Sequence, residues 1–195
     1  MNESGNSKLR KGEGKAEAVK ETEGYYEHTE RFEIIEGVRY DFLSSPKYHH
    51  QKILTNFYLA FHSACCMDGE ILLAPLDVHF DEENIVQPDV IYIANENKAI
   101  IRDGFVFGAP DLLVEILSRS TGHRDKTVKK LLYERYGVKE YWLADPAYRI
   151  VEQFVLDNGK YLQAAVWTEK DRLISATVPC LAMELAGIFP EGPDV

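Results

Sequence analysis

One acidic residue stands inside one of the most apolar segments of this chain. Residues 112–117 read Leu-Leu-Val-Glu-Ile-Leu, so that Glu115 has only aliphatic neighbours along the backbone. A short run of Leu, Val and Ile is typical of a strand that is covered on both faces. Because Glu is almost never buried without a partner, the segment predicts a central strand whose acid is ion-paired or functional.

A second acid follows a proline at the start of another apolar segment. Residues 86–93 read Val-Gln-Pro-Asp-Val-Ile-Tyr-Ile, and proline within sheets is confined to edges, bulges or the first residue of a strand. We therefore expect Asp89 at the mouth of a strand, although a turn-capping Asp also fits this position. Two carboxylates that meet at strand ends repel each other, and a divalent metal, a lysine or both would relieve that repulsion.

A basic helix is predicted directly after the Glu115 segment. It begins near Gly122 and ends at Gly137, a residue type that commonly terminates helices. Asp125, Lys129 and Tyr133 are spaced four apart and form one polar stripe. Taken by itself, the stripe also fits a solvated face with an ordinary ion pair one helical turn apart.

The charge distribution favours a local basic site on an acidic protein. The net charge is −10, which argues against indiscriminate binding of nucleic acid. Residues 119–139, however, hold seven basic side chains against two acidic ones. Distant surface acids are largely screened at physiological salt, so a basic patch around the predicted helix can still act on phosphates.

The remaining pattern predicts one α/β (α+β) domain, in which helices flank a mixed sheet and an antiparallel meander follows. We expect two short strands within residues 32–42, a helix over 48–64, and strands over 71–80, 85–93 and 140–144. The meander comprises strands over 149–156, 161–166 and 173–176, with a hairpin turn at 157–159. Residues 1–22 read as a disordered polar tail before a single domain over 23–195.

Composition argues against membrane insertion and export. No apolar run approaches the roughly 20 residues that span a bilayer, and the polar N-terminus lacks the apolar centre of a signal peptide. The three cysteines, Cys65, Cys66 and Cys180, form an odd count without metal-ligand spacing. We therefore expect a cytoplasmic protein in a reducing compartment, with no zinc and no membrane partner.

Together these motifs resemble the PD-(D/E)XK nuclease superfamily, and specifically the restriction endonuclease family known as Uma-two. The resemblance implies a restriction-endonuclease-like core with its active site at the mouth of two adjacent strands. It covers roughly residues 25–190. It is carried by residues 32–37 (Phe-Glu-Ile-Ile-Glu-Gly), 50–53, 87–90, 108–118, 125–133 and 137–146.

The resemblance also implies catalytic roles for particular residues. Asp89 is the first acid of the superfamily motif and Glu115 is the second. The lysine that usually follows the second acid by two residues is absent, because Leu117 occupies that place. In this family the lysine comes from the next helix, which implies Lys129.

For two further residues, Glu33 and His50, the resemblance allows an active-site role, and a simple structural explanation also fits. Glu33 is a candidate for an additional catalytic acid, while a strand Glu that faces solvent fits the same position. His50 lies on the apolar face of the first helix, where a hydrogen-bonded core histidine is the usual finding. The aromatic side chains of Tyr133 and Tyr141 are expected to serve packing.

The implied function is metal-dependent hydrolysis of DNA by an endonuclease. Mg²⁺ or Mn²⁺ would be held by Asp89, Glu115 and the backbone carbonyl of Ile116, since these ions prefer oxygen ligands. The alternative is a nuclease-fold protein that binds nucleic acid or a protein partner without cutting. Homodimerisation through the meander or the first helix is plausible, because one site cuts one strand. The expected contacts to the DNA phosphate backbone come from Arg119, Arg124, Lys126 and Lys130.

Overall fold

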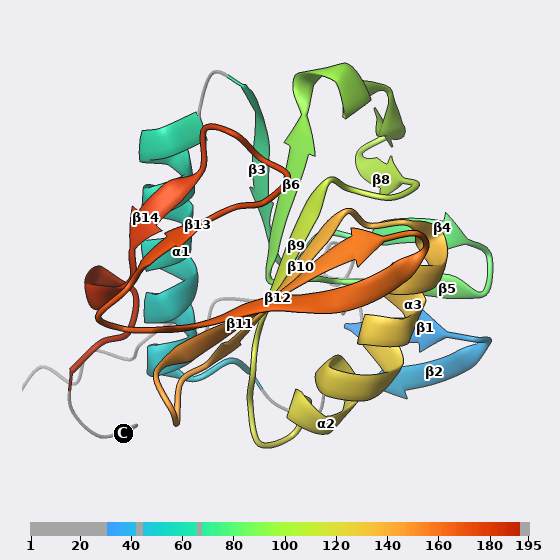
Figure 1. Ribbon diagram of the computed structural model, residues 1–195. Coiled ribbons are helices and arrows are strands. Elements are labelled where there is room, and N and C mark those ends of the chain that lie inside the picture. The colour runs from blue at the N-terminus through green and yellow to red at the C-terminus, as the bar shows by residue number, and fades with distance from the viewer. Residues whose placement is uncertain (1–30, 42–44, 66–67, 192–195) are drawn as a thin grey trace, which may run out of the picture.

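A mixed six-stranded sheet forms the centre of the computed structural model, which describes residues 31–41, 45–65 and 68–191 (Figure 1). The strand order is β12-β11-β10-β9-β6-β3. Strands β9 and β10 are parallel, and every other neighbouring pair is antiparallel. The strands are β3 (Gly69–Leu73), β6 (Val90–Ala94), β9 (Leu112–Ile116), β10 (Glu140–Asp145), β11 (Ile150–Asp157) and β12 (Lys160–Thr168).

A second sheet, in the order β2-β1-β5-β4-β8-β7, packs against one face of the central sheet. Its strands β7 and β8 were not predicted. The strands are β1 (Phe32–Ile35), β2 (Val38–Asp41), β4 (Val78–Asp81), β5 (Asn84–Val86), β7 (Ile101–Arg102) and β8 (Phe105–Phe107).

Two predicted strands are wrong as single elements. Residues 71–80 divide between β3 and β4, and residues 85–93 divide between β5 and β6, in both cases across the two sheets. Each division coincides with a proline, Pro75 or Pro88, which cannot donate to a strand ladder. The second division leaves Asp89 immediately before β6, so the predicted position at a strand mouth is confirmed.

The helix predicted over residues 48–64 is confirmed as α1 (Tyr48–Cys65), which covers one face of the central sheet. Its residues Ile53, Phe57 and Phe61 are fully buried against alternate residues of the sheet, among them Val114 and Trp142. The opposite face carries Leu113 and Tyr141 and packs against the second sheet and the basic helix. Since side chains alternate along a strand, Glu115 faces this second side.

The predicted basic helix is confirmed, with one local irregularity. It consists of α2 (Gly122–Arg124), a π-helical turn η2 (Asp125–Lys129) and α3 (Lys130–Tyr136). It ends at Gly137, whose φ of 81° suits glycine, as the sequence predicted. π-Helical turns are rare and occur frequently at functional sites, and this one contains both Asp125 and Lys129.

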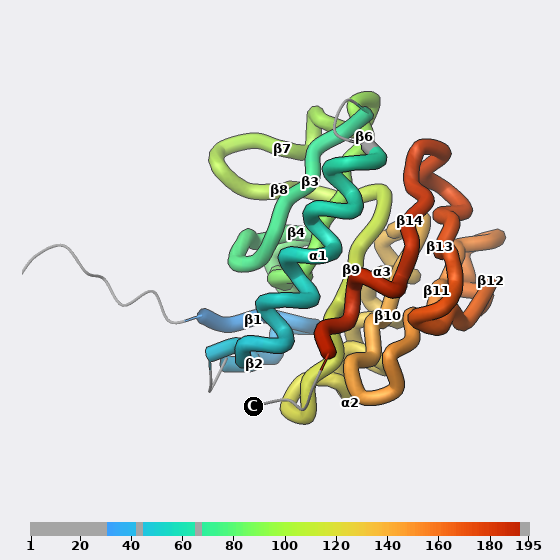
Figure 2. Tube along the Cα trace, turned by 90° about the vertical axis from the view of Figure 1, so that its left-hand side faces the viewer, coloured from blue at the N-terminus to red at the C-terminus, as the bar shows by residue number. Residues whose placement is uncertain are grey.

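The predicted meander is correct for β11 and β12, which pair in antiparallel order with a turn at Asn158 and Gly159, and the separately predicted strand over 140–144 is confirmed as β10 beside β11. The expected third strand is wrong as a meander element. Strand β13 (Arg172–Ile174) pairs with β14 (Ala182–Glu184) in a separate two-stranded sheet. This small sheet lies beside α1 in both views (Figures 1 and 2). The short helices η1 (Asn95–Ile100) and η3 (Leu185–Gly187) complete the described chain.

Three further expectations from the sequence concern the N-terminal tail, membrane insertion and the cysteines. The predicted disordered tail, residues 1–22, lies outside the described residues. Within the described segments, no helix is both long and apolar enough to cross a bilayer. Cys180 is disulfide-bonded, a bond that the odd cysteine count and the spacing did not predict.

Candidate active site

Asp89 and Glu115 face each other across the β6–β9 pair. Val90 lies opposite Val114 in this antiparallel register, and one further step along both strands places Asp89 opposite Glu115. Opposite residues of an antiparallel pair project from the same face of the sheet with neighbouring Cβ atoms. Asp89 Oδ2 also accepts a hydrogen bond from the backbone N–H of Ile116 at 2.7 Å. The start of one strand and the end of the next thus bring two carboxylates to one edge of the sheet.

The expectation that buried Glu115 has a cationic partner is confirmed. Its Oε1 lies 2.7 Å from Lys129 Nζ and accepts a hydrogen bond from the Tyr133 hydroxyl at 2.8 Å. The second oxygen, Oε2, takes no part in these contacts. Only 4% of the residue is exposed, and burial raises the pKa of the Glu115 carboxyl well above its ordinary range despite the opposing effect of Lys129.

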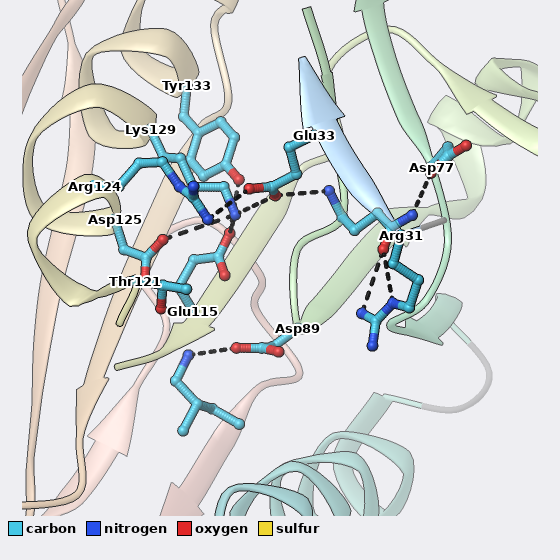
Figure 3. Close-up of polar contacts among 12 residues, drawn as sticks. Arg31, Glu33, Asp77, Asp89, Glu115, Thr121, Arg124, Asp125, Lys129 and Tyr133 are labelled. Atoms are coloured by element: carbon cyan, nitrogen blue, oxygen red, sulfur yellow. Dashed lines mark hydrogen bonds and ion pairs between the residues drawn. The ribbon is translucent and has the colours of Figure 1, made fainter. Parts of the chain in front are cut away.

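Lys129 is the cation around which the site is built (Figure 3). Its Nζ lies 2.6 Å from Glu33 Oε1, 2.7 Å from Glu115 Oε1 and 3.8 Å from Asp125 Oδ1. The residue is 2% exposed, so the alternative of a solvated polar stripe is wrong. Burial lowers the pKa of Lys129, but the neighbouring carboxylates outweigh burial and hold this pKa above its usual value. The ammonium is therefore charged.

Glu33, at the second position of β1, is fully buried, so the alternative of a solvent-facing strand Glu is wrong. Besides Lys129, Glu33 contacts Arg124, whose Nη2 lies 3.3 Å from Oε2. Its Oε1 accepts a hydrogen bond at 3.0 Å from the N–H of Gln87, two residues before Asp89. Glu33 therefore ties the second sheet to the segment that carries the first candidate acid.

Gln87 extends this connection in a way that the sequence did not indicate. Its side-chain amide donates to Asp77 Oδ1 at 2.8 Å, and its carbonyl oxygen accepts from the guanidinium of Arg31 at 3.3 Å. These contacts hold the turn before Asp89 from both sides (Figure 3). No periodic or motif signal marks Asp77 or Arg31 in the sequence, because both belong to the site only through this turn.

His50 lies at the site and not in the interior of the core. Its Nε2 is 3.2 Å from Asp89 Oδ2, and 18% of the side chain is exposed. Burial lowers the pKa of His50, but the hydrogen bond and charge of Asp89 outweigh burial, and the pKa lies above 6.5. His50 thus contacts Asp89 from the side of α1, while the N–H of Ile116 contacts it from β9.

Asp125 and Tyr133 belong to the site although the sequence analysis gave neither a catalytic role. Asp125 is 2% exposed, and burial raises the pKa of its carboxyl. Tyr133 is fully buried, as a packing residue should be, and its hydroxyl in addition orients Glu115. The spacing of four residues on either side of Lys129 was the signal that could have identified both.

The carboxylates of the site outnumber its cations, and this excess suits a divalent metal. Glu33, Glu115 and Asp125 surround Lys129, and Asp89 lies opposite Glu115. Burial raises the pKa values of Glu115 and Asp125, and the neighbouring carboxylates raise them further against the opposing effect of Lys129. Oxygen donors of this kind match the preference of Mg²⁺.

The geometry also limits the number of side-chain ligands. The described part of the chain contains no group of three or more His, Cys, Asp or Glu side chains arranged to hold a metal ion. The predicted set consists of two carboxylates, from Asp89 and Glu115, and the backbone carbonyl of Ile116. This set fits Mg²⁺, because that ion usually keeps several waters and binds through one or two carboxylates.

A cleft of about 950 Å³ leads to these residues. Its walls are the N-terminal end of α1, the loop that joins β9 to α2, the β10–β11 turn and residues 189–190. Asp89, Glu115 and Lys129 all line it. Further basic residues on its wall are Arg31, Lys47, Arg119, Arg124, Lys126 and Arg149.

The four predicted phosphate-binding residues occupy different environments. Arg119 is exposed on the cleft wall, and Lys126 lies there with its Nζ 3.3 Å from Glu152 Oε1. Arg124 instead turns inward, because the buried carboxylate of Glu33 attracts it, and it is 17% exposed. Lys130 is not among the cleft residues, and its Nζ lies 3.7 Å above the ring of Phe154.

Comparison with known proteins supports the resemblance seen in the sequence. The model of the Uma2 family, described as "Putative restriction endonuclease", matches residues 19–186. The search of curated proteins gives no match. A solved structure described as "a putative nuclease belonging to DUF820 from Anabaena variabilis" has a TM-score of 0.67 at 19% identity, over 81% of this chain and 89% of that chain. The type IIG restriction endonuclease BpuSI has a TM-score of 0.41 at 15% identity, over 67% of this chain and 15% of that chain.

Proposed function

This chain belongs to the Uma-two restriction endonuclease family, and from that premise we propose that it is a metal-dependent endonuclease that hydrolyses DNA. The observation that carries the proposal is the convergence of Asp89, Glu115 and Lys129 in one cleft. Sequence positions far apart contribute these three groups, and the fold buries two of them almost completely. Burying so much charge is costly, and perturbed acids in a cleft are typical of catalytic sites.

The carboxylates of Asp89 and Glu115 and the backbone carbonyl of Ile116 would hold Mg²⁺ or Mn²⁺. When bound, such an ion lowers the pKa of a coordinated water and neutralises charge that develops on the phosphate. The N–H of Ile116 fixes one oxygen of Asp89, and Tyr133 with Lys129 fixes one oxygen of Glu115. Each carboxylate therefore keeps one oxygen for the cleft while its orientation is set by the protein.

Lys129 acts as a fixed positive charge and not as a base, because its raised pKa keeps the ammonium protonated. From its place between Glu33 and Glu115 it orients the attacking water or a phosphate oxygen. The water oxygen bonds to phosphorus while the bond from phosphorus to the leaving sugar oxygen breaks. One proton from the water ends on that leaving oxygen and the other on the new phosphate or solvent.

Exposed cations on the cleft wall would bind the phosphate backbone. Arg119 and Lys126 are placed for this role. Contacts of this kind position the nucleic acid without reading its sequence. Binding should therefore weaken steeply as salt concentration rises.

Homodimerisation is part of the proposal, because the central sheet has an exposed apolar edge. Strand β12 is an edge of the central sheet and exposes Leu162 and Val166, 56% and 51% exposed. Exposed apolar edge strands are common sites of strand pairing between chains. We therefore assign the interface to the meander, one of the two possibilities that the sequence left open.

One observation favours a second candidate, a nuclease-fold protein that binds without cutting. The ammonium of Lys129 contacts three carboxylates and is 2% exposed, which limits its access to a substrate. Metal affinity separates the two candidates. If calorimetry detects neither Mg²⁺ nor Mn²⁺ binding at millimolar concentration, the non-cutting candidate is the better account.

Plasmid nicking tests the proposed activity. We expect purified protein to nick supercoiled plasmid in a Mg²⁺ or Mn²⁺ titration, and Asp89→Asn or Glu115→Gln to abolish nicking because each removes a metal-binding charge. Asp103→Asn serves as a matched control, since Asp103 is an exposed turn residue outside the cleft. Nicking that persists in either site variant at the wild-type rate would remove the assignment.

A further inference from the structure

Two highly exposed tyrosines lie between residues that line the cleft. Tyr48, at the first position of α1, is 66% exposed, and Tyr148, in the β10–β11 turn, is 76% exposed. In each case the residues on both sides in the chain line the cleft. The N-terminal end of α1 and the β10–β11 turn lie at the same end of the molecule (Figure 2). Neither tyrosine is itself among the residues that line the cleft, so each lies next to the cleft wall, on a different element.

The candidate catalytic groups lie deep in this cleft. Glu115 is 4% exposed and Lys129 is 2% exposed, and the side chain of Asp89 is 14% exposed. A volume of about 950 Å³ is that of a pocket for one drug-sized ligand. Part of one nucleic-acid strand fits such a space. A stacked duplex, whose major groove alone is about 12 Å wide, would remain at the rim.

The cleft wall carries positive charge, and the two tyrosines adjoin this wall in the chain. Arg119 is exposed there, and the side chain of Lys126 is 42% exposed. Cationic grooves bordered by aromatic side chains are the typical means of binding single strands, because unpaired bases stack on the rings. In a duplex the bases are already stacked on one another, so the rings would gain little.

We propose that the substrate of this site is single-stranded DNA, and that Tyr48 and Tyr148 stack on its unpaired bases. The backbone between the stacked bases then descends to Asp89 and Glu115, where it can be cleaved. This inference rests on the proposed nuclease function and specifies its substrate class. A free single strand and the unpaired strand of a flap or overhang present the same chemistry to the cleft.

Binding is measured by fluorescence anisotropy with full-length Glu115→Gln protein in Mg²⁺, so that the DNA stays intact. The probe is a labelled 20-nucleotide strand, alone or annealed to its complement. We expect the single strand to bind about tenfold tighter than the duplex, the effect of one or two stacked bases. Tyr48→Ala or Tyr148→Ala should weaken single-strand binding about 5-fold or more and leave duplex binding almost unchanged.

Two variants serve as controls for these substitutions. Tyr48→Phe keeps the ring and should bind the single strand like the parent protein. Phe105→Ala removes an exposed aromatic residue, 42% exposed, whose neighbours in the chain do not line the cleft, and should change neither affinity. Circular dichroism confirms that each variant is folded, which is expected because both tyrosine side chains are exposed.

The same labelled strands are then offered to wild-type protein with Mg²⁺ or Mn²⁺. Faster cleavage of the single strand than of the duplex supports the inference. Equal or tighter binding of the duplex, or tyrosine variants that bind the single strand like the parent, overturns it. A single-strand preference in binding without cleavage of either DNA keeps this inference and contradicts the proposed hydrolysis.

Discussion

Replacing Lys129 by methionine should destabilise the folded protein, because the substitution removes the positive charge but keeps a side chain of similar volume. Met keeps the length of the side chain but leaves Glu33, Glu115 and Asp125 without the ammonium that they share. Removing one partner of a buried ion pair typically costs about 3–5 kcal/mol, because the remaining charge stays buried. For a domain of this size that cost corresponds to a fall in melting temperature of about 6–20 °C.

The loss of stability in Lys129→Met should increase as pH rises. A carboxyl whose pKa is raised in the folded state is most favourable to folding below its unfolded pKa, and that contribution is lost as pH rises through the folded pKa. Burial already raises the pKa of Glu115 and Asp125, and removing Lys129 raises both further. The difference in free energy of unfolding between Lys129→Met and wild type should therefore grow from pH 5 to pH 8.

Urea unfolding of the metal-free protein in EDTA measures this difference at both pH values. Lys160→Met is the matched control, since Lys160 pairs with Glu134 at 2.7 Å while its side chain is 77% exposed. Exposed pairs contribute about 0–1 kcal/mol. If Lys129→Met costs no more than Lys160→Met at pH 8, the three carboxylates do not depend on Lys129, and the reasoning about the site is wrong.

Three further predictions concern neighbouring parts of the molecule. In metal-free protein, the pKa of His50 measured by NMR titration should lie above its ordinary value and fall in Asp89→Asn, which removes the charge of Asp89; an unchanged value would refute the role of Asp89. The stability from the His50–Asp89 pair should accordingly be present below pH 6.5 and be lost as pH rises through the raised pKa. Glu115→Gln should be at least as stable as wild type at pH 8 while inactive, since it removes a carboxyl with a raised pKa; a marked loss of stability would contradict this. Leu162→Lys should convert a dimer into monomers in analytical ultracentrifugation, because a charge on β12 opposes strand pairing; an unaltered dimer would place the interface elsewhere.

The sequence predicted the elements that carry strong local patterns. The α1 helix, β9 and the end of the basic helix at Gly137 follow from helical periodicity, an aliphatic run and a glycine cap. The division of residues 71–80 and 85–93 between two sheets did not follow, because an apolar run looks the same in one long strand and in two short ones. Pro75 and Pro88 marked the breaks but could not indicate that the chain changes sheets there.

The sequence likewise indicated the chemically important side chain Glu115 better than it indicated which residues the basic side chains contact. Glu115 was recognisable because an acid in an aliphatic strand is costly, and the structure gives it the cation that the cost requires. Arg124 and Lys130 were expected to bind phosphate because they belong to the basic run over residues 119–139. Their actual contacts, with Glu33 and Phe154, depend on elements distant in the chain and carry no local signal.

In the proposed function, Asp89 and Glu115 hold one metal ion between them. Anomalous scattering from crystals soaked in Mn²⁺ tests it most directly, because it locates the ion without relying on activity. We expect one peak in contact with a carboxylate oxygen of each residue, and its loss in Asp89→Asn crystals. If a soaked crystal shows no peak at this position, or if the peak persists in the variant, the two carboxylates do not share a metal ion.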